Sequence, residues 1–258
     1  MMTQPTPSLT AVVPVYNHEH AVANVVDGLL AAGLPCLLVD DGSGPECAAS
    51  LDRLVTTHPG VTLIRRRING GKGAAVADGL REALKAGYTH AIQVDADGQH
   101  SLDDVGVFLE AAARSPDALI CGQPMFDASM PKARFFFRYL THVFVWLNTL
   151  SFDIRDSMCG FRVYPLAATV AMLDTERPGA RMDFDIEVLV RLYWRNIRMV
   201  WIPTQVRYPQ DGVSHFRLLH DNALITWLHA RLFLGMLIRI PNLVKHRLSS
   251  LGDGHHAS

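Results

Sequence analysis

Short apolar runs alternate with amphipathic stretches through the first half of this chain. The apolar runs predict buried strands at Leu9–Val15, Cys36–Val39, Val61–Ile64, His90–Val94 and Ala118–Cys121. The stretches between them carry apolar residues at helical spacing and predict helices over His18–Ala32, Pro45–Thr57, Gly73–Ala86 and Leu102–Ala113. Strands that are apolar throughout are typical of a parallel sheet with helices on both faces. The pattern therefore predicts an α/β fold built on a mostly parallel sheet flanked by helices.

The second half of the chain does not keep this regular alternation. Its expected features are an aromatic-rich stretch over Lys132–Leu150, a loop at Asp156–Arg162, a helix over Asp183–Tyr193, a strand over Met199–Ile202 and a long amphipathic stretch over Leu218–Leu248. We expect one main domain over residues 1–216. Residues 217–258 are expected to form a C-terminal amphipathic helical extension that ends in a disordered polar tail.

The most apolar part of the C-terminal region is Leu224–Ile240, and Arg231 and Arg239 interrupt it. A helix that spans a bilayer needs about 20 consecutive apolar residues, so the sequence predicts no transmembrane helix. The aromatic residues of Lys132–Leu150 and of the C-terminal stretch, with arginines among them, have two interpretations. They either lie in the interface of a membrane or pack into the core.

Composition and charge narrow the class of protein. Hydrophobic residues make up 49% of the chain, and 24 Lys and Arg nearly balance 25 Asp and Glu. This lack of a basic excess argues against nucleic acid as a partner. The four cysteines form no CxxC pair and predict reduced, buried thiols. With no signal peptide recognisable, we expect a cytoplasmic protein, peripheral on the inner face of the membrane if the interfacial interpretation holds.

Chemically reactive side chains follow the predicted strands where parallel sheets bind their ligands. The fourth strand ends in Asp95-Ala96-Asp97-Gly98-Gln99-His100. In an extended segment Asp95 and Asp97 face the same side, and two carboxylates there repel each other unless a cation compensates them. Mg²⁺ or Mn²⁺ would suit these oxygens, and Gln99 could add an amide oxygen. The alternative is an ordinary solvated turn.

Several motifs together identify a resemblance. P-V-Y-N-H-E (Pro14–Glu19), V-D-D-G-S (Val39–Ser43), N-G-G-K-G-A-A (Asn69–Ala75), V-D-A-D-G-Q-H (Val94–His100) and D-S-M-C-G-F-R-V-Y (Asp156–Tyr164) occur in that order. This set resembles the family 2 glycosyltransferases of the GT-A (Rossmann-like) fold, in particular the dolichyl-phosphate mannose synthase-like branch. The resemblance implies metal-dependent transfer of a sugar from a UDP- or GDP-linked donor to a lipid or lipid-phosphate acceptor, with inversion.

The resemblance also implies roles for residues at the strand ends. Pro14, Tyr16 and Glu19 would form the floor and edge of the nucleotide pocket, and Asp41 would bind the base or ribose. Alternatively, Pro14 and Tyr16 only shape the backbone where the strand ends, and Asp41 belongs to a turn that caps the N-terminus of the next helix. Lys72 lies in a glycine-rich loop before a helix, where backbone amides and its own charge favour phosphate. The alternative there is a flexible turn with a surface lysine.

By the same resemblance, Asp97 and Gln99 would be direct metal ligands, with Asp95 close to the nucleotide. Arginine suits forked recognition of phosphate. The candidates in the second half of the chain are Arg134, Arg162 and Arg207, each with a structural role as the alternative.

Two departures from the branch concern the acceptor. Gln123 stands where relatives often place an arginine after the fifth strand, and Ser214-His215-Phe216 replaces a Ser-Lys-Leu run. Both changes remove a cation, so an uncharged hydroxyl becomes a credible acceptor beside a phosphate. A hydroxyl would need a general base. The candidate bases are Asp183, Asp185 and Asp156, with N-capping as the alternative for Asp183.

Two other functions remain open at this point. A sugar nucleotidyltransferase would want a glycine-rich basic loop after the first strand, which P-V-Y-N-H-E is not. A catalytically silent nucleotide-binding partner of a lipid-modifying complex would tolerate the loss of the acids, yet Asp41, Asp95 and Asp97 are all present.

Overall fold

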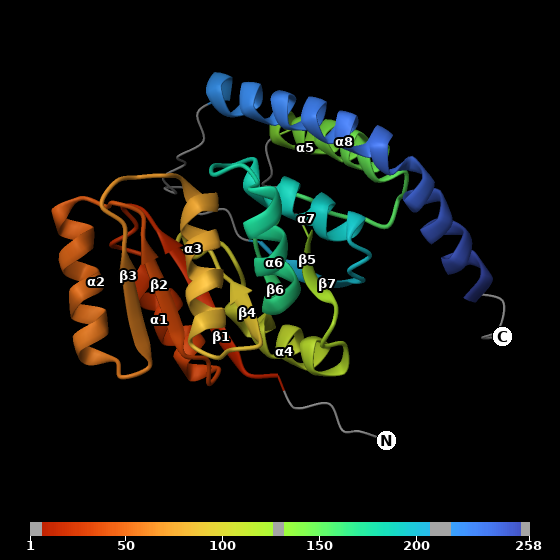
Figure 1. Cartoon of the computed structure of the whole chain (residues 1–258). Coiled ribbons are helices and arrows are strands. Elements are labelled where there is room, and N and C mark those ends of the chain that lie inside the picture. The colour runs from red at the N-terminus through yellow and green to blue at the C-terminus, as the bar shows by residue number, and fades with distance from the viewer. Residues whose placement is uncertain (1–6, 126–131, 207–217, 254–258) are drawn as a thin grey trace.

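A single mixed sheet organises the protein. The computed structural model describes residues 7–125, 132–206 and 218–253, and within them a seven-stranded sheet has the order β3-β2-β1-β4-β6-β5-β7 (Figure 1). The strands are β1 (Leu9–Val15), β2 (Cys36–Asp40), β3 (Val61–Arg65), β4 (His90–Gln93), β5 (Leu119–Met125), β6 (Arg162–Pro165) and β7 (Met199–Gln205). Only β6 runs antiparallel to its neighbours, β4 and β5, among these paired strands. The predicted mostly parallel sheet is confirmed.

Helices cover both faces of the sheet. They are α1 (Val22–Ala31), α2 (Pro45–Thr57), α3 (Lys72–Lys85), α4 (Val105–Arg114), α5 (Lys132–Thr149), α6 (Leu166–Glu176), α7 (Phe184–Trp194) and α8 (Leu218–Asp253), with a short 3₁₀ turn η1 at Leu102–Asp104. Alternate residues of β1 enter opposite cores: Val12 packs with α3, α6 and α7, whereas Ala11 and Val13 pack with α1, α2 and α4. This double burial explains why the strands are apolar throughout.

Most element boundaries agree with the sequence pattern, and the differences have local causes. Helix α1 begins at Val22 rather than His18, and the helix expected from Leu102 is divided into η1 and α4. Strand β6 and helix α6 were missed. Strand β6 begins with a buried arginine, which hides its apolar character, and α6 (L-A-A-T-V-A-M-L-D-T-E) has no regular polar face. All four cysteines are free and buried, as expected.

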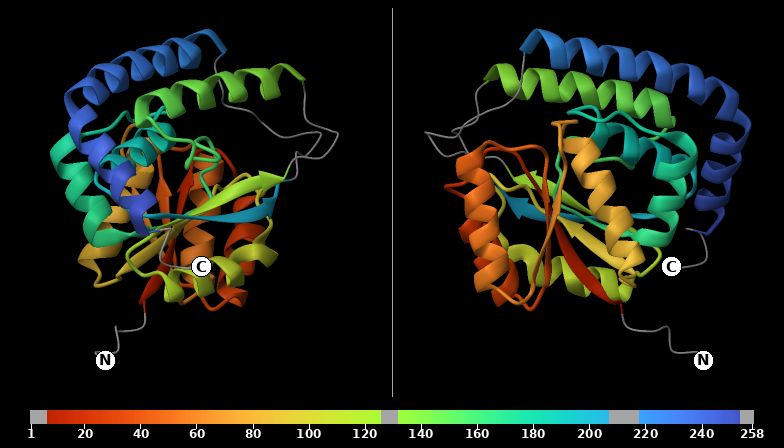
Figure 2. Two further views of the ribbon diagram at one scale, coloured as in Figure 1. Left: turned by 90° about the vertical axis from the view of Figure 1, so that its right-hand side faces the viewer. Right: turned by 60° about the vertical axis from the view of Figure 1, so that its left-hand side comes forward.

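Helices α5 and α8 lie side by side at the end of the molecule away from the start of β1 (Figure 1), and Figure 2 shows the same pairing from two other sides. The Phe144 ring on α5 stacks on the His229 ring on α8, with centroids 5.1 Å apart. Asn148 Nδ2 lies 3.3 Å from His229 Nδ1. The tail expected after α8 lies outside the described residues.

Within the described residues, the segment Leu224–Lys245 of α8 is long and apolar enough to cross a membrane by length and composition alone. No membrane-spanning segment was expected here, because Arg231 and Arg239 interrupt the apolar run. In the structure Arg231 Nη2 pairs with Glu187 Oε2 on α7 at 2.8 Å, and the Arg239 guanidinium carbon lies 4.7 Å from the Trp194 ring centroid. Both charges therefore face the protein, although the two arginines interrupt the apolar run in the sequence.

Candidate active site

The carboxyl ends of β1, β2 and β4 lie next to one another at one edge of the sheet. Val15 at the end of β1 pairs with Asp40 at the end of β2, and β4 pairs with β1 on the other side. The three sequence motifs that follow these strands therefore share one edge, as expected for a parallel sheet. Figure 1 shows β1 running toward the side of the molecule that carries α5 and α8.

Lys72 is the centre of the site. Its Nζ, on the first residue of α3, lies 2.8 Å from Asp95 Oδ2 and 2.9 Å from Asp185 Oδ2. Burial alone would lower the pKa of Lys72, but the charges of Asp185 and Asp95 raise it well above its ordinary value. Gln93, which ends β4, donates through Nε2 to Asp185 Oδ1 at 3.2 Å. Two carboxylates from distant segments are thus held on one ammonium group.

Gln93 was missed by the sequence analysis. The signal that could have identified it is a glutamine between the apolar residues Ile92 and Val94 of the predicted strand; the structure buries its side chain fully. Its side-chain oxygen also accepts from Tyr164 Oη at 3.1 Å. Gln93 therefore links the strand interior to the Asp185 carboxylate.

Gly160 lets the loop of the D-S-M-C-G-F-R motif approach this cluster. A Cβ at position 160 would lie 2.6 Å from Gln93 Nε2, 2.8 Å from Lys72 Nζ and 3.3 Å from Asp95 Oδ1. Any side chain there would have to displace groups that are already paired. The glycine of this motif is thus required for the loop to approach the Lys72 cluster closely.

Asp95 and Asp97 retain the capacity to bind a cation. Asp95 Oδ1 is buried without a hydrogen-bond partner, while Asp97 Oδ1 accepts from the Gln99 backbone N–H at 3.0 Å. Burial and then the neighbouring Asp95 charge raise the pKa of Asp97. Within the described residues no cluster of three or more His, Cys, Asp or Glu forms a complete metal site. Mg²⁺ or Mn²⁺ needs only one or two carboxylates when substrate phosphates complete its shell, so these residues fit such an ion.

The glycine-rich loop before α3 is already engaged by Asp41. Asp41 is buried, and it accepts from the backbone N–H groups of Gly70 at 2.9 Å and Gly71 at 2.8 Å. Arg66 Nη1 donates to Asp41 at 2.7 Å. Gly71 has φ of 100°, a conformation that glycine adopts without strain. The expectation that these two amides receive phosphate is therefore corrected: they hold Asp41 in place.

Arg162 lies behind the site rather than in it. It is fully buried, and its guanidinium donates to the backbone carbonyls of Asp185 at 2.6 Å and Ser157 at 2.8 Å. These bonds orient the start of α7 and the loop before β6. The expected phosphate contact from Arg162 does not fit this burial, because no part of its side chain reaches solvent.

The two acids at the start of α7 have separate surroundings. Asp185 contacts Lys72, whereas Asp183 accepts from the Arg181 backbone N–H at 3.1 Å. Burial raises the pKa of Asp183. The fully buried Glu187, one turn further on, pairs with Arg191 and Arg231. Of the two candidate bases on or beside α7, only Asp185 is brought to the Lys72 cluster.

The remaining predicted residues lie around the end of β1 or outside the described side chains. Pro14 is buried in β1, and Tyr16 and Glu19 follow it, partly exposed. Glu19 Oε2 is buried without a hydrogen-bond partner. Arg134 belongs to α5, but its side chain lies outside the described residues, and so do Arg207 and Ser214-His215-Phe216.

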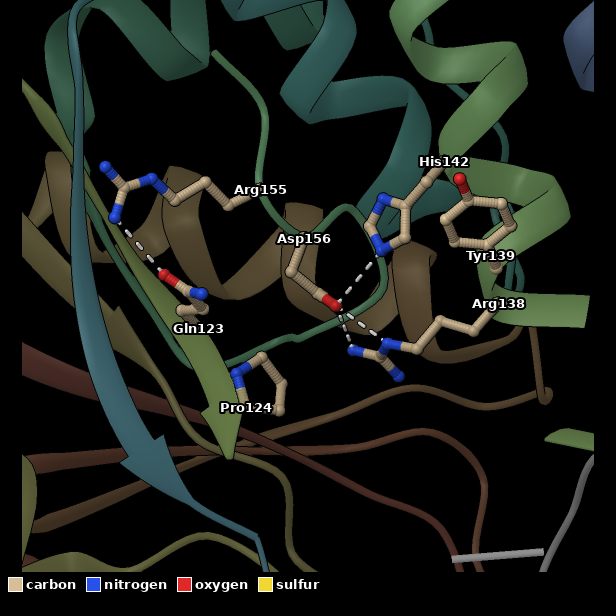
Figure 3. A pocket seen from close by; sticks show the side chains of 7 residues that line it. All are labelled: Gln123, Pro124, Arg138, Tyr139, His142, Arg155 and Asp156. Carbon is tan, nitrogen blue, oxygen red and sulfur yellow. Dashed lines mark hydrogen bonds and ion pairs between the residues drawn. The ribbon is translucent and has the colours of Figure 1, made fainter. Parts of the chain in front are cut away.

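A pocket of about 120 Å³ opens near the end of β5 (Figure 3). Its lining consists of Gln123, Pro124, Arg138, Tyr139, His142, Arg155 and Asp156. Asp156 was expected as a candidate base, but the cluster around it was not predicted from the sequence. Two residues spaced one helical turn apart, Arg138 and His142, were the available signal.

The comparison with family models decides the family. The model of glycosyl transferase family 2 matches residues 10–169, which include β1 to β6 and every strand-end motif described above. The chain belongs to this family. The resemblance on which the sequence analysis relied is thereby confirmed.

Several relatives of this family 2 glycosyltransferase are named for lipid-phosphate acceptors. Polyprenol monophosphomannose synthase of Mycolicibacterium smegmatis is 31% identical over 121 residues, which span 45% of each chain. Undecaprenyl-phosphate mannosyltransferase of Micrococcus luteus is 25% identical over 74% of this chain and 80% of that one. Dolichyl-phosphate beta-glucosyltransferase of Drosophila melanogaster is 29% identical over 81% of this chain and 69% of that one. The family 2 chain thus resembles the dolichyl-phosphate mannose synthase-like branch.

Solved structures support the same fold. A mannosyltransferase from Pyrobaculum calidifontis, in complex with GDP-Man and Mn²⁺, superposes with a TM-score of 0.57 and 15% identity, covering 99% of this chain and 82% of that one. The TarS protein of S. aureus (residues 1–349), in complex with UDP-GlcNAc, gives a TM-score of 0.52 at 13% identity, covering 90% of this chain and 72% of that one. The family 2 glycosyltransferase described here has the GT-A fold.

Proposed function

We propose that this family 2 glycosyltransferase moves a sugar from a UDP- or GDP-linked donor to the phosphate of a membrane lipid, using Mg²⁺ or Mn²⁺ and inverting the anomeric centre. The observation that carries the proposal is a group of carboxylates: Asp95 and Asp97 follow the central strand β4, and Asp185 at the start of α7 shares Lys72 with Asp95. The names of the relatives support the lipid phosphate and the sugar donor. In this proposal residues 1–216 form the transferase domain and residues 217–258 its membrane-facing extension.

The donor would lie across the ends of β1, β2 and β4. Asp97 and Gln99, with Asp95 beside them, would hold the metal, which when bound neutralises charge on the diphosphate leaving group. Tyr16 offers a ring face for a base. The unpartnered buried oxygen of Glu19 offers an acceptor for a base or ribose donor. Pro14 would form the floor of the same pocket, with Asp41 setting the loop that borders it.

Asp185 would face the reacting centre. Lys72 supports this role because its ammonium group compensates the Asp185 charge. A phosphate acceptor is already an anionic nucleophile and needs no base, whereas a hydroxyl acceptor would need one. We infer that Asp185 rather than Asp183 would take the proton in that second case. Arg162 would act as a positioning residue through the Asp185 backbone carbonyl.

A lipid bilayer is the proposed partner of α5 and α8. The exposed apolar side chains on α5 are Leu140, Val143, Phe144 and Leu147, and those on α8 include Trp227, Leu234, Leu237 and Ile238. The α5 residues repeat at the spacing of a single helical face. Trp227 is 65% exposed and suits the headgroup level of a membrane. Because Arg231 and Arg239 of α8 face the protein, they add no charge to this apolar surface.

Donor binding and turnover test the proposal. The full chain is incubated with UDP- and GDP-sugars, a polyprenyl phosphate and either Mn²⁺ or EDTA, and products are identified by mass spectrometry. We expect one donor class to yield a glycosylated lipid phosphate in Mn²⁺ alone. Asp97→Ala should lose turnover and stay folded, while the matched control Glu110→Ala, whose carboxylate is 73% exposed on α4, keeps it. Full activity of Asp97→Ala would refute the metal assignment.

Flotation on vesicles of phosphatidylethanolamine and phosphatidylglycerol tests the membrane partner. The unmodified chain should float with the vesicles, and the double variant Leu234→Glu/Ile238→Glu should stay in the dense fraction. Val107→Glu is the matched control, because Val107 is 46% exposed on α4, away from α5 and α8. If the unmodified chain stays in the dense fraction and sediments as a dimer, and the double variant sediments as a monomer, the apolar surface binds a protein partner and not the bilayer.

A further inference from the structure

The pocket at the end of β5 contains one charge that its own residues do not compensate. Two guanidinium groups, one imidazole and one carboxylate line it (Figure 3). Arg138 and Arg155 carry two positive charges, whereas Asp156 carries one negative charge. The balance is positive even when the imidazole is neutral, so the pocket is suited to an anion.

One half of the pocket is a wall whose charged side chains are paired with one another. Asp156 Oδ2 accepts from Arg138 Nε at 2.7 Å and lies 2.6 Å from Arg138 Nη2. His142 Nε2 lies 3.5 Å from the same oxygen. Asp156 Oδ1 accepts from the backbone N–H groups of Met158 and Cys159. Burial alone would raise the pKa of Asp156, but Arg138 and His142 lower it to about 2, so this carboxylate stays ionised.

Arg155 forms the other half of the pocket, and it contacts a neutral amide where Arg138 contacts a carboxylate. It is exposed, and its Nη1 donates to the side-chain oxygen of Gln123 at 3.4 Å. In the described part of the chain, no carboxylate forms an ion pair with this guanidinium. A neutral amide therefore binds the Arg155 guanidinium at the pocket lining without cancelling its charge. Figure 3 shows the Gln123 and Arg155 side chains pointing toward each other from β5 and from the loop before β6.

This arrangement revises the argument from sequence about Gln123. The glutamine stands where relatives often place an arginine, and its presence suggested that a cation had been lost. The guanidinium of Arg155 lies against Gln123, so the cation comes from another segment. The doubt that Gln123 cast on an anionic acceptor is thereby removed.

The pocket is close to both the Lys72 cluster and α5. Asp156 in the pocket and Gly160 beside Lys72 belong to one loop, and four residues of extended chain span at most about 14 Å. On its other side the pocket is lined by Tyr139, next to the exposed Leu140 and Val143 of α5. A ligand with an anionic head and an apolar tail matches both neighbours.

We infer that Arg155, positioned by Gln123, binds the phosphate monoester of the lipid acceptor and selects it over the corresponding alcohol. This inference rests on the proposed function and names the residues that would determine its acceptor class. Arginine suits this task because its planar fork matches phosphate oxygens. The Arg138–Asp156–His142 wall would keep the head group from entering further.

Binding of citronellyl phosphate, citronellol and inorganic phosphate to the full chain tests the inference by calorimetry. We expect citronellyl phosphate to bind at least about tenfold more tightly than either other probe, since hydrogen bonds to a charged group contribute this much. Arg155→Gln should weaken citronellyl phosphate about 10- to 100-fold and leave citronellol unchanged. Arg114→Gln, another exposed arginine, is the matched control.

A second variant tests the interchange of the two positions. Gln123→Arg in the Arg155→Gln background should restore most of the affinity for citronellyl phosphate, because it returns a cation to the same place. Unchanged binding in Arg155→Gln, or equal binding of the phosphate and the alcohol, would overturn the inference. Equally tight inorganic phosphate would show a free-anion site and overturn the lipid assignment.

Donor binding separates this inference from the proposed function. GDP and UDP are titrated with Mn²⁺ into the same variants, and Arg155→Gln should bind them as the unmodified chain does. If neither nucleotide binds while citronellyl phosphate binding still depends on Arg155, the proposed function fails and the phosphate site stands. If nucleotides bind and Arg155→Gln has no effect on citronellyl phosphate, only the present inference fails.

Discussion

Replacing Lys72 by methionine should destabilise the protein, because the ammonium group separates two carboxylates. Its Nζ contacts Asp95 Oδ2 at 2.8 Å and Asp185 Oδ2 at 2.9 Å, and the three side chains are at most 24% exposed. The two oxygens are thus about 6 Å apart at most, where two like charges repel by about 3 kcal/mol at an effective dielectric constant of about 20. Methionine keeps most of the volume and removes the charge.

Urea unfolding in EDTA near neutral pH measures this effect. The free energy of unfolding should fall by about 3 kcal/mol in Lys72→Met. The double variant Lys72→Met/Asp185→Asn carries only one of the two charges and should recover most of that loss. Lys85→Met, on the same helix and 69% exposed, should change stability by less than about 0.5 kcal/mol.

The double variant decides whether the reasoning is right. If it is no more stable than Lys72→Met, the two carboxylates do not repel each other, and the cost of losing Lys72 has another origin. If Lys72→Met lowered the free energy of unfolding no more than Lys85→Met does, the electrostatic account would be refuted altogether.

Three further predictions concern other parts of the molecule. Gly160→Ala should lower turnover roughly tenfold or more in steady-state assays while circular dichroism stays unchanged, because its Cβ would lie 2.8 Å from Lys72 Nζ; full activity would contradict this. Glu187→Gln should lower the free energy of unfolding by about 3 to 5 kcal/mol in urea titrations, since this buried carboxylate pairs with two arginines. Burial lowers the pKa of His229 from 6.5 to about 4, so the unfolded chain takes up the proton first as pH falls. Stability should decrease by about 3 kcal/mol between pH 7 and pH 4, and His229→Gln should reduce that decrease.

The parallel part of the fold could be predicted because its signals are local. Each strand from β1 to β5 was recognised as an apolar run, and the motifs at the ends of β1, β2 and β4 follow such runs directly in the sequence. Strand β6 could not be predicted in the same way. Its pairing with β4 joins residues about 70 positions apart, and its first residue is an arginine whose burial depends on carbonyls of other segments.

The acidic residues of the candidate site were predicted from the sequence, but the ion pairs that they form were not. Nothing local in the sequence indicates that Lys72 contacts Asp185, because α3 and α7 meet only in the folded chain. The loop amides offered to phosphate were correctly placed before a helix, yet Asp41 binds them first. Arg231 and Arg239 of α8 were counted against a membrane-spanning helix because the sequence records their charge but not the direction in which they face.

The reversed direction of β6 has a consequence for how the enzyme's specificity could change. Because β6 enters the sheet at the edge where β4 and β5 leave it, the short segment from Asp156 to Gly160 touches both the β5 pocket and the Lys72 cluster. An insertion or deletion in this segment would disturb two substrate positions together. New acceptor preferences should therefore arise by single replacements at its flanks, such as positions 123 and 155, while the length of the segment stays constant.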